Sequence, residues 1–299
     1  MNPSRDIDRL TFTTPTGPRR CPVSLARHTV GQRPDARTAR RCRITGQQSD
    51  VTGLDLAALA SAAEQELRAA GRPEHAQHEQ AYLKSSLEHI GASVPVIRAL
   101  AKRIRRERPD LDVSTSFALA EELWAKPVHE RRMLAVVLLG LYAGSMTPAD
   151  LDRVEPLLRD SRTWALVDGL AGDVAATIVL RHPDEPGVDA TVRRWGRDDD
   201  FWVRRSALLA HLQTLGRNGE FHGWSRFCEL ADAMLDEREF FIRKAIGWVL
   251  REAGKRRPER VVDFLAPRVS RVSGVTVREA VRYLDPADRD ALMAAYRRR

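Results

Sequence analysis

Apolar residues recur at three- and four-residue steps along most of the chain after residue 54, which is the spacing that places them on one face of an α-helix. The pattern predicts helices over residues 55–70, 94–106, 116–124, 131–143, 149–158, 163–181, 186–195, 200–214, 221–235, 238–254, 259–270, 276–284 and 287–298. No segment alternates apolar and polar residues convincingly, as a half-buried strand does. We therefore expect an all-α fold.

Several of these predicted helices begin with similar segments, which indicates an internal repeat. The clearest are Trp164-Ala-Leu-Val-Asp168, Trp202-Val-Arg-Arg-Ser206 and Phe241-Ile-Arg-Lys-Ala245, and Thr276-Val-Arg-Glu-Ala280 is a weaker fourth. Their spacing of roughly 35–40 residues lies in or just below the range of HEAT-like helix pairs. Stacked helix pairs form a curved solenoid whose second helices line the concave face. We expect such a solenoid, with a concave groove able to hold duplex DNA.

The first 52 residues differ from the rest because they are rich in Pro, Thr, Arg, Gly and Gln and lack apolar periodicity. They contain ten Arg, no Lys and four Asp, and so carry +6 of the formal net charge of +8. We expect a disordered basic tail over 1–52 and one repeat domain over 53–299. A dispensable leader, a basic arm that adds DNA affinity and a mitochondrial transit peptide all remain open for the tail.

The composition excludes several classes of protein. Apolar residues make up 43% of the chain and charged residues 30%, as in ordinary globular proteins. No apolar run is long enough for a membrane helix or a secretory signal, so we expect a cytoplasmic protein without a membrane partner. Cys21, Cys42 and Cys228 form no CxxC pair, the eight histidines are scattered, and no HExxH, GxSxG or phosphate-binding loop occurs. We expect no disulfide framework, metal or cofactor.

Residues that could carry chemistry gather on the second helices of successive repeats. They are Trp164 and Asp168, then Arg204 and Arg205, then Lys244, Trp248 and Arg251. Residues four apart project from the same helix face, so Trp164 and Asp168 are neighbours one turn apart. Each of these residues taken alone is more often a packing or surface residue. Their recurrence at one repeat position favours a shared function.

Three of these stretches resemble the AlkD family of DNA alkylation repair glycosylases. They are Trp164-Ala-Leu-Val-Asp168, Phe201-Trp-Val-Arg-Arg-Ser-Ala-Leu-Leu209 and Glu239-Phe-Phe-Ile-Arg-Lys-Ala-Ile-Gly-Trp-Val-Leu-Arg-Glu252. The resemblance runs from about Tyr82 to the end of the chain, and the third stretch is highly specific. It leaves the first 52 residues out.

The resemblance implies a role for each matching residue. Asp168 corresponds to the family's catalytic aspartate, and Trp164 and Trp248 to its two sugar-facing tryptophans. Arg205 corresponds to its phosphate-binding arginine, with Arg204 as the other possible register. Further DNA contacts are implied at Lys244, Arg243, Tyr82 and Lys84. Residues 87–91, Leu-Glu-His-Ile-Gly, depart from the family pattern, which bears on the choice of lesion.

These correspondences predict a monofunctional glycosylase that acts as a monomer on duplex DNA. It would hydrolyse the N-glycosidic bond of cationic N3- or N7-alkylated purines without flipping the base. Two alternatives stay open. One is a HEAT-repeat scaffold that binds DNA or protein without catalysis. The other is a self-resistance glycosylase for bulky adducts left by an alkylating natural product.

Overall fold

The computed structural model describes residues 55–215 and 222–298, and the predicted tail over 1–52 lies outside them. The described residues form helices joined by turns and contain no strand, which confirms the all-α prediction. The α-helices are α1 (Leu56–Ala70), α2 (Pro73–Leu83), α3 (Val94–Glu107), α4 (Val113–Trp124), α5 (His129–Tyr142), α6 (Leu151–Arg159), α7 (Trp164–Gly169), α8 (Ala176–Arg181), α9 (Pro186–Trp195), α10 (Phe201–Leu209), α11 (Trp224–Ala233), α12 (Phe240–Gly254), α13 (Pro258–Leu265), α14 (Gly274–Ala280) and α15 (Pro286–Arg297).

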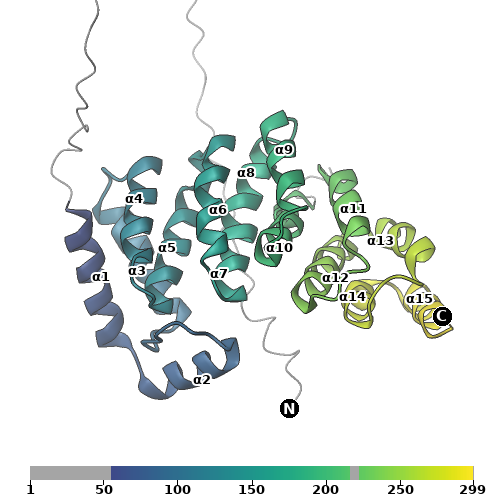
Figure 1. Ribbon diagram of the computed structural model, residues 1–299, viewed down its shortest axis with the longest axis horizontal. Helices are drawn as coiled ribbons and strands as arrows, with labels where there is room; N and C mark the ends of the chain where they lie inside the picture. The colour runs from purple at the N-terminus through teal and green to yellow at the C-terminus, as the bar shows by residue number, and fades with distance from the viewer. Residues whose placement is uncertain (1–54, 216–221, 299) are drawn as a thin grey trace, which may run out of the picture. The chain divides into compact units, whose positions relative to one another are not determined.

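The helices follow one another in chain order from α1 to α15 (Figure 1). From α4 onward, first helices (α4, α6, α9 and α11) alternate along the chain with second helices (α5, α7, α10 and α12), and α4 packs against α5 as α9 does against α10. Second helices of neighbouring pairs pack together, since α7 contacts both α5 and α10, and α10 contacts α12. This arrangement is the predicted helical repeat solenoid.

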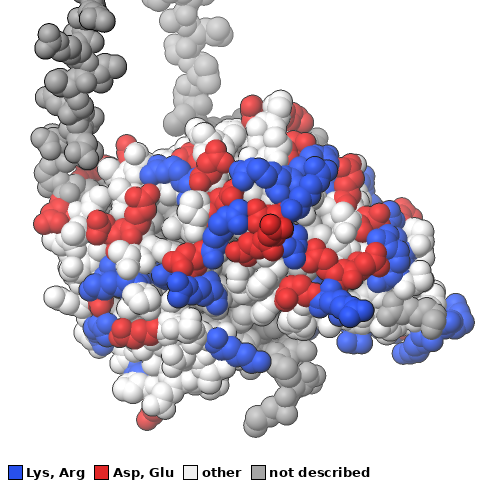
Figure 2. Space-filling view, viewed as in Figure 1, with Lys and Arg blue, Asp and Glu red and all other residues white. Residues whose placement is uncertain are grey.

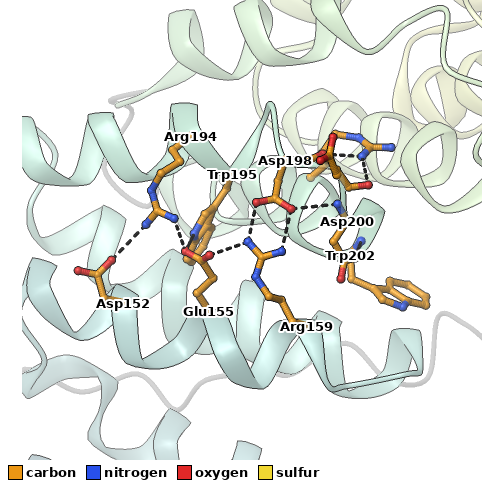
Figure 3. A network of polar contacts seen from close by, with 10 residues as sticks. Asp152, Glu155, Arg159, Arg194, Trp195, Asp198, Asp200 and Trp202 are labelled. Atoms are coloured by element: carbon orange, nitrogen blue, oxygen red, sulfur yellow. Dashed lines mark hydrogen bonds and ion pairs between the residues drawn. The ribbon is translucent and has the colours of Figure 1, made fainter.

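Side-chain interactions recur at the period of the repeat. Arg159 of α6 pairs with Asp198 after α9 across 39 residues, and Arg194 of α9 reaches back 39 residues to Glu155 of α6. The indole of Trp195 also donates to Glu155 at 2.7 Å (Figure 3). Acidic and basic side chains are interspersed over the face seen in Figure 2. Ion pairs therefore join α6 to α9, and the face seen in Figure 2 is not uniformly basic.

Polar side chains fix where several helices begin. The Asp112 carboxylate accepts from the Thr115 backbone N–H at 2.8 Å, and the Thr115 hydroxyl accepts from the Asp112 backbone N–H at 2.7 Å. This reciprocal pair is a capping box, which satisfies amide groups that the helix cannot. It starts α4 at Val113, three residues before the predicted start at 116.

One long second helix widens in its middle. The predicted helix over 163–181 is observed as α7, a π-helical segment η4 (Leu170–Ala175) and α8, without a break. A π-helical turn holds an extra residue and often occurs at functional sites. Asp168 lies two residues before this segment.

The helix α2 was not predicted from apolar periodicity, because only Leu83 of its residues is buried. The segment after it is fixed to α5 instead. The buried carboxylate of Glu130 accepts from the Ile90 backbone N–H at 2.9 Å. Gly91 has a φ of 85°, and a Cβ atom there would lie 2.1 Å from the Arg72 carbonyl oxygen. Only glycine fits that position.

None of the described helices combines the length and the apolar character needed to cross a membrane.

Candidate functional site

An ion pair between two second helices lies at the centre of the predicted site. Arg205 of α10 donates from Nε to one carboxylate oxygen of Asp168 at 2.8 Å and from Nη2 to the other at 3.0 Å. The side chains are 3% and 11% exposed respectively. Two parallel charge-assisted hydrogen bonds fix the plane of the carboxylate as well as its position.

Arg205 also connects this pair to a third helix. Its Nη1 donates to the carbonyl oxygen of Phe241 in α12 at 2.6 Å, and its guanidinium carbon lies 5.7 Å from the centre of the Phe241 ring. One side chain therefore joins α7, α10 and α12. Arginine suits this position because its donors point in several fixed directions within one plane.

The backbone around Asp168 allows α7 to approach α5 closely. Gly169 follows Asp168, and a Cβ atom on it would lie 2.5 Å from Cγ1 of Val136 in α5. A side chain at residue 169 would push α7 away from α5. The glycine therefore helps to set the depth at which Asp168 lies.

Trp164 begins α7 and lies one turn before Asp168 on the same helix. Both residues are half-buried, so each remains partly exposed to solvent. The ring of Tyr82 in α2 meets the Trp164 ring edge-on, with centroids 5.8 Å apart and an interplanar angle of 83°. The structure thus brings Tyr82 beside Trp164, and it places Lys84 exposed at the end of α2.

Trp248 lies on α12, seven residues after Phe241, and is half-buried. Among the residues that the structure describes, it makes no hydrogen bond or ring contact with Asp168, Arg205 or Trp164. Arg205 joins the start of α12, at Phe241, to Asp168.

The other predicted DNA-contacting cations are engaged within the protein. Arg204 forms two hydrogen bonds to the carboxylate of Glu237, each 3.0 Å long. Lys244 pairs with Glu279 and is 12% exposed at its side chain, and Arg243 donates to the Glu237 carbonyl oxygen at 2.7 Å. The Arg204 and Lys244 contacts join neighbouring repeats, and the Arg243 contact fixes the turn before α12. Of the two arginine registers considered for the site, it is Arg205 that meets Asp168.

Burial shifts the pKa of two carboxyl groups here, that of Asp168 in the ion pair and that of Asp173 nearby. Burial raises the pKa of Asp168 above its ordinary value, while the charge and hydrogen bonds of Arg205 oppose that rise. Asp173, in the π-helical segment, has its pKa raised to about 7 by burial, with Arg98 opposing and the Asp168 charge adding. Arg205 therefore stabilises the ionised form of Asp168, whereas burial stabilises its protonated form.

An aromatic group beside Arg205 was missed by sequence reasoning. Phe201 and Trp202 begin α10 with ring centroids 4.4 Å apart, and Trp202 lies 4.8 Å from Phe241. Phe240 contacts Phe241 edge-on and is 52% exposed. The sequence signal that could have indicated this group is a pair of adjacent aromatic residues at the start of both α10 and α12.

Comparison with known proteins identifies the family. The family model for DNA alkylation repair enzymes matches residues 63–284. The chain belongs to this family. A solved structure titled a predicted DNA alkylation repair enzyme from Enterococcus faecalis is similar in fold, with a TM-score of 0.62 and 22% sequence identity over 72% of this chain and 97% of that chain. No curated protein matches the sequence. Membership assigns the chain a role in DNA alkylation repair and DNA as its partner.

Proposed function

We propose that this DNA alkylation repair enzyme is a monofunctional glycosylase that hydrolyses the N-glycosidic bond of cationic N3- or N7-alkylpurines in duplex DNA. The observation that carries the proposal is the Asp168 carboxylate, held by two hydrogen bonds from Arg205 and set one turn from the half-buried Trp164. A fixed negative charge beside an aromatic face suits a reaction that develops positive charge.

Hydrolysis of this glycosidic bond requires little from the protein beyond the negative charge of Asp168. An N3- or N7-alkylated purine is already cationic, so it leaves as a neutral base without protonation by a general acid. Positive charge then develops on the deoxyribose, and a fixed carboxylate stabilises it and can orient the attacking water. Asp168 has both tasks in the proposed mechanism, and both require its ionised form.

Trp164 supports the same step. The face of an indole carries negative potential, so it attracts a sugar that is becoming cationic, by about 0.5–2 kcal/mol per contact. Tyr82 packs edge-on against Trp164 and limits the rotation of its ring. Trp248 is the second aromatic candidate, on α12.

Arg205 has a positioning task in addition to the phosphate contact expected from its sequence. The contacts described above use one N–H from each of its three nitrogens. Each Nη group carries a second hydrogen, but the side chain is only 3% exposed, so a DNA phosphate reaches these donors only if the guanidinium moves outward. In the proposal, the main task of Arg205 is to hold Asp168 towards the sugar, so that the lesion need not be flipped into a pocket.

Base release from methylated duplex DNA tests the function. The wild-type protein should liberate 7-methylguanine or 3-methyladenine, identified by chromatography, and Asp168→Asn should not. Asp152→Asn, which changes a carboxylate that is 71% exposed on α6, is the matched control and should keep full activity. Undiminished release by Asp168→Asn would remove the residue from the mechanism.

The same experiment distinguishes the two alternatives. DNA binding without any base release would favour a non-catalytic scaffold. Release of a bulky N7 adduct much faster than of a methylated base would favour self-resistance to a DNA-alkylating natural product.

A further inference from the structure

Three residues that are far apart in the sequence meet between α2 and α5. Glu79 lies in α2, His89 in the segment that follows it, and His129 is the first residue of α5. One carboxylate oxygen and one nitrogen from each ring lie within 4.8 Å of one another. Nothing in the proposed glycosylase mechanism uses these side chains.

The polar atoms of this cluster are buried without partners. The side chain of His89 is 1% exposed and His129 is 2% exposed. Glu79 Oε2, both ring nitrogens of His89 and Nδ1 of His129 have no hydrogen-bond partner in the protein. Buried polar atoms in folded proteins nearly always have a partner, so four orphaned atoms in one place indicate a missing one.

The backbone holds the two histidines side by side. The His129 backbone N–H donates to the Glu88 carbonyl oxygen at 2.8 Å, and the Glu88 N–H donates to Pro127 at 2.9 Å. The rings of His89 and His129 stack with centroids 4.5 Å apart and an angle of 10°. His89 Nδ1 and Glu79 Oε2 are 3.5 Å apart, which is too long for a good hydrogen bond.

We propose that Glu79, His89 and His129 bind one divalent cation of the zinc class. Two imidazoles and one carboxylate are a donor set that Zn²⁺ and similar borderline metals accept at about 2.0–2.2 Å. Binding draws the three donors together, and it turns the two rings from their parallel stack so that each directs a nitrogen at the ion.

The side chains of the cluster can supply the forms that bind a metal. A carboxylate and a neutral imidazole are the forms that ligate a metal ion. The nearby cation Arg132 is paired with Asp160 at 2.9 Å.

The ion would fasten α2 to the rest of the domain. Only Leu83 of α2 is buried, so few apolar contacts hold this helix. Tyr82, which meets Trp164, lies three residues after Glu79 on α2. The metal is thus a structural clamp beside the proposed catalytic site, and it takes no part in breaking the glycosidic bond.

Metal binding by the full-length protein tests the proposal without any measurement of base release. The protein is stripped with a chelator, and Zn²⁺ is then titrated by calorimetry. We expect one equivalent bound and a rise in the melting temperature. Glu79→Gln and His129→Gln should each weaken binding by about 100-fold or more, beyond the roughly 10–100-fold that loss of an outer-shell partner costs. His78→Gln, an exposed histidine on the same helix, is the matched control.

Cobalt supplies a second readout if one variant folds poorly. Co²⁺ bound by two imidazoles and a carboxylate gives visible absorption bands, which should be present in the wild type and in His78→Gln. Far-UV circular dichroism checks that Glu79→Gln keeps its helices. Absence of Zn²⁺ binding by the wild type would overturn the proposal. So would unchanged affinity and an unchanged Co²⁺ spectrum in the folded Glu79→Gln variant, because the ion would then be bound elsewhere.

Discussion

Replacing Arg205 by alanine removes the partner of a nearly buried carboxylate and leaves its charge uncompensated. The substitution deletes two hydrogen bonds to Asp168 and one to the Phe241 carbonyl oxygen. Breaking a buried ion pair from one side costs about 3–5 kcal/mol, since the remaining charge stays desolvated. We therefore expect Arg205→Ala to lower the free energy of unfolding by that amount at pH 8.

Urea unfolding of a double-mutant cycle checks the cause of this loss. Asp168→Asn removes the charge, so Arg205→Ala should cost less in that background, with an interaction energy of about 0.5–3 kcal/mol. Arg289→Ala, which removes only an exposed ion pair with Asp290, is the control and should change stability little. Additive effects of the two substitutions, or a loss below about 1 kcal/mol in Arg205→Ala, would refute the assigned coupling.

The same variant should change the pH dependence of base release. Arg205 lowers the pKa of Asp168 against the effect of burial. Without Arg205 the pKa rises further, so a larger fraction of Asp168 is protonated and inactive at neutral pH. The acidic limb of the pH–rate profile should move to higher pH, and activity should recover partly as the pH is raised. An unmoved limb would show that Arg205 does not act through Asp168.

Three further substitutions test neighbouring parts of the site. The folded-state pKa of Asp173 is raised from 3.8 to about 7, so the protonated carboxyl group favours folding at low pH, and this contribution is lost as the pH rises through this range. In urea unfolding, Asp173→Asn should therefore be more stable than the wild type at pH 8, by at most about 4 kcal/mol, but not at pH 4. Gly169→Ala should cost about 1–3 kcal/mol because of its contact with Val136, and this cost should be smaller when Val136 is alanine; an equal cost in the Val136→Ala background would contradict the assigned close approach. Trp164→Ala should slow base release by about 2–30-fold in single-turnover kinetics, the equivalent of one cation–π contact, and an unchanged rate would count against its role.

Apolar periodicity predicted most of the fold because a solenoid repeats one helix pair, and every pair must bury the same faces. The helices α9 and α12 begin or end within two residues of their predicted positions. The spacing of Trp164, Trp202 and Phe241 indicated the repeat because the motifs share a place at the start of second helices. Periodicity failed at α2 because that helix buries almost no apolar side chain.

Several residues of the candidate site could be named from the sequence, but the contacts between them could not be predicted. Asp168 and Trp164 could be placed on one face because both lie on one helix. That Arg205 rather than Arg204 meets Asp168 depends on how α10 is rotated against α7, which the sequence does not encode locally. The three nitrogens of Arg205 are also used within the protein, a feature that no motif indicates.

The histidine cluster could not be predicted from spacing. Metal motifs are recognised when ligands lie a few residues apart on one element. Here Glu79, His89 and His129 come from two helices and a connecting segment, and only the packing of α2 against α5 brings them together. We expected no metal because the histidines are scattered along the chain, and the proposed site departs from that expectation.

The central claim is that the Asp168 carboxylate stabilises the positive charge that develops on the deoxyribose as the base leaves. The most direct measurement is the single-turnover rate of 7-methylguanine release by Asp168→Asn, at protein concentrations that saturate the DNA. We predict a rate at least about 100-fold below that of the wild type, the usual loss for a fixed electrostatic group, with DNA affinity nearly unchanged. A rate within a few-fold of the wild type, on DNA that is fully bound, would contradict the account.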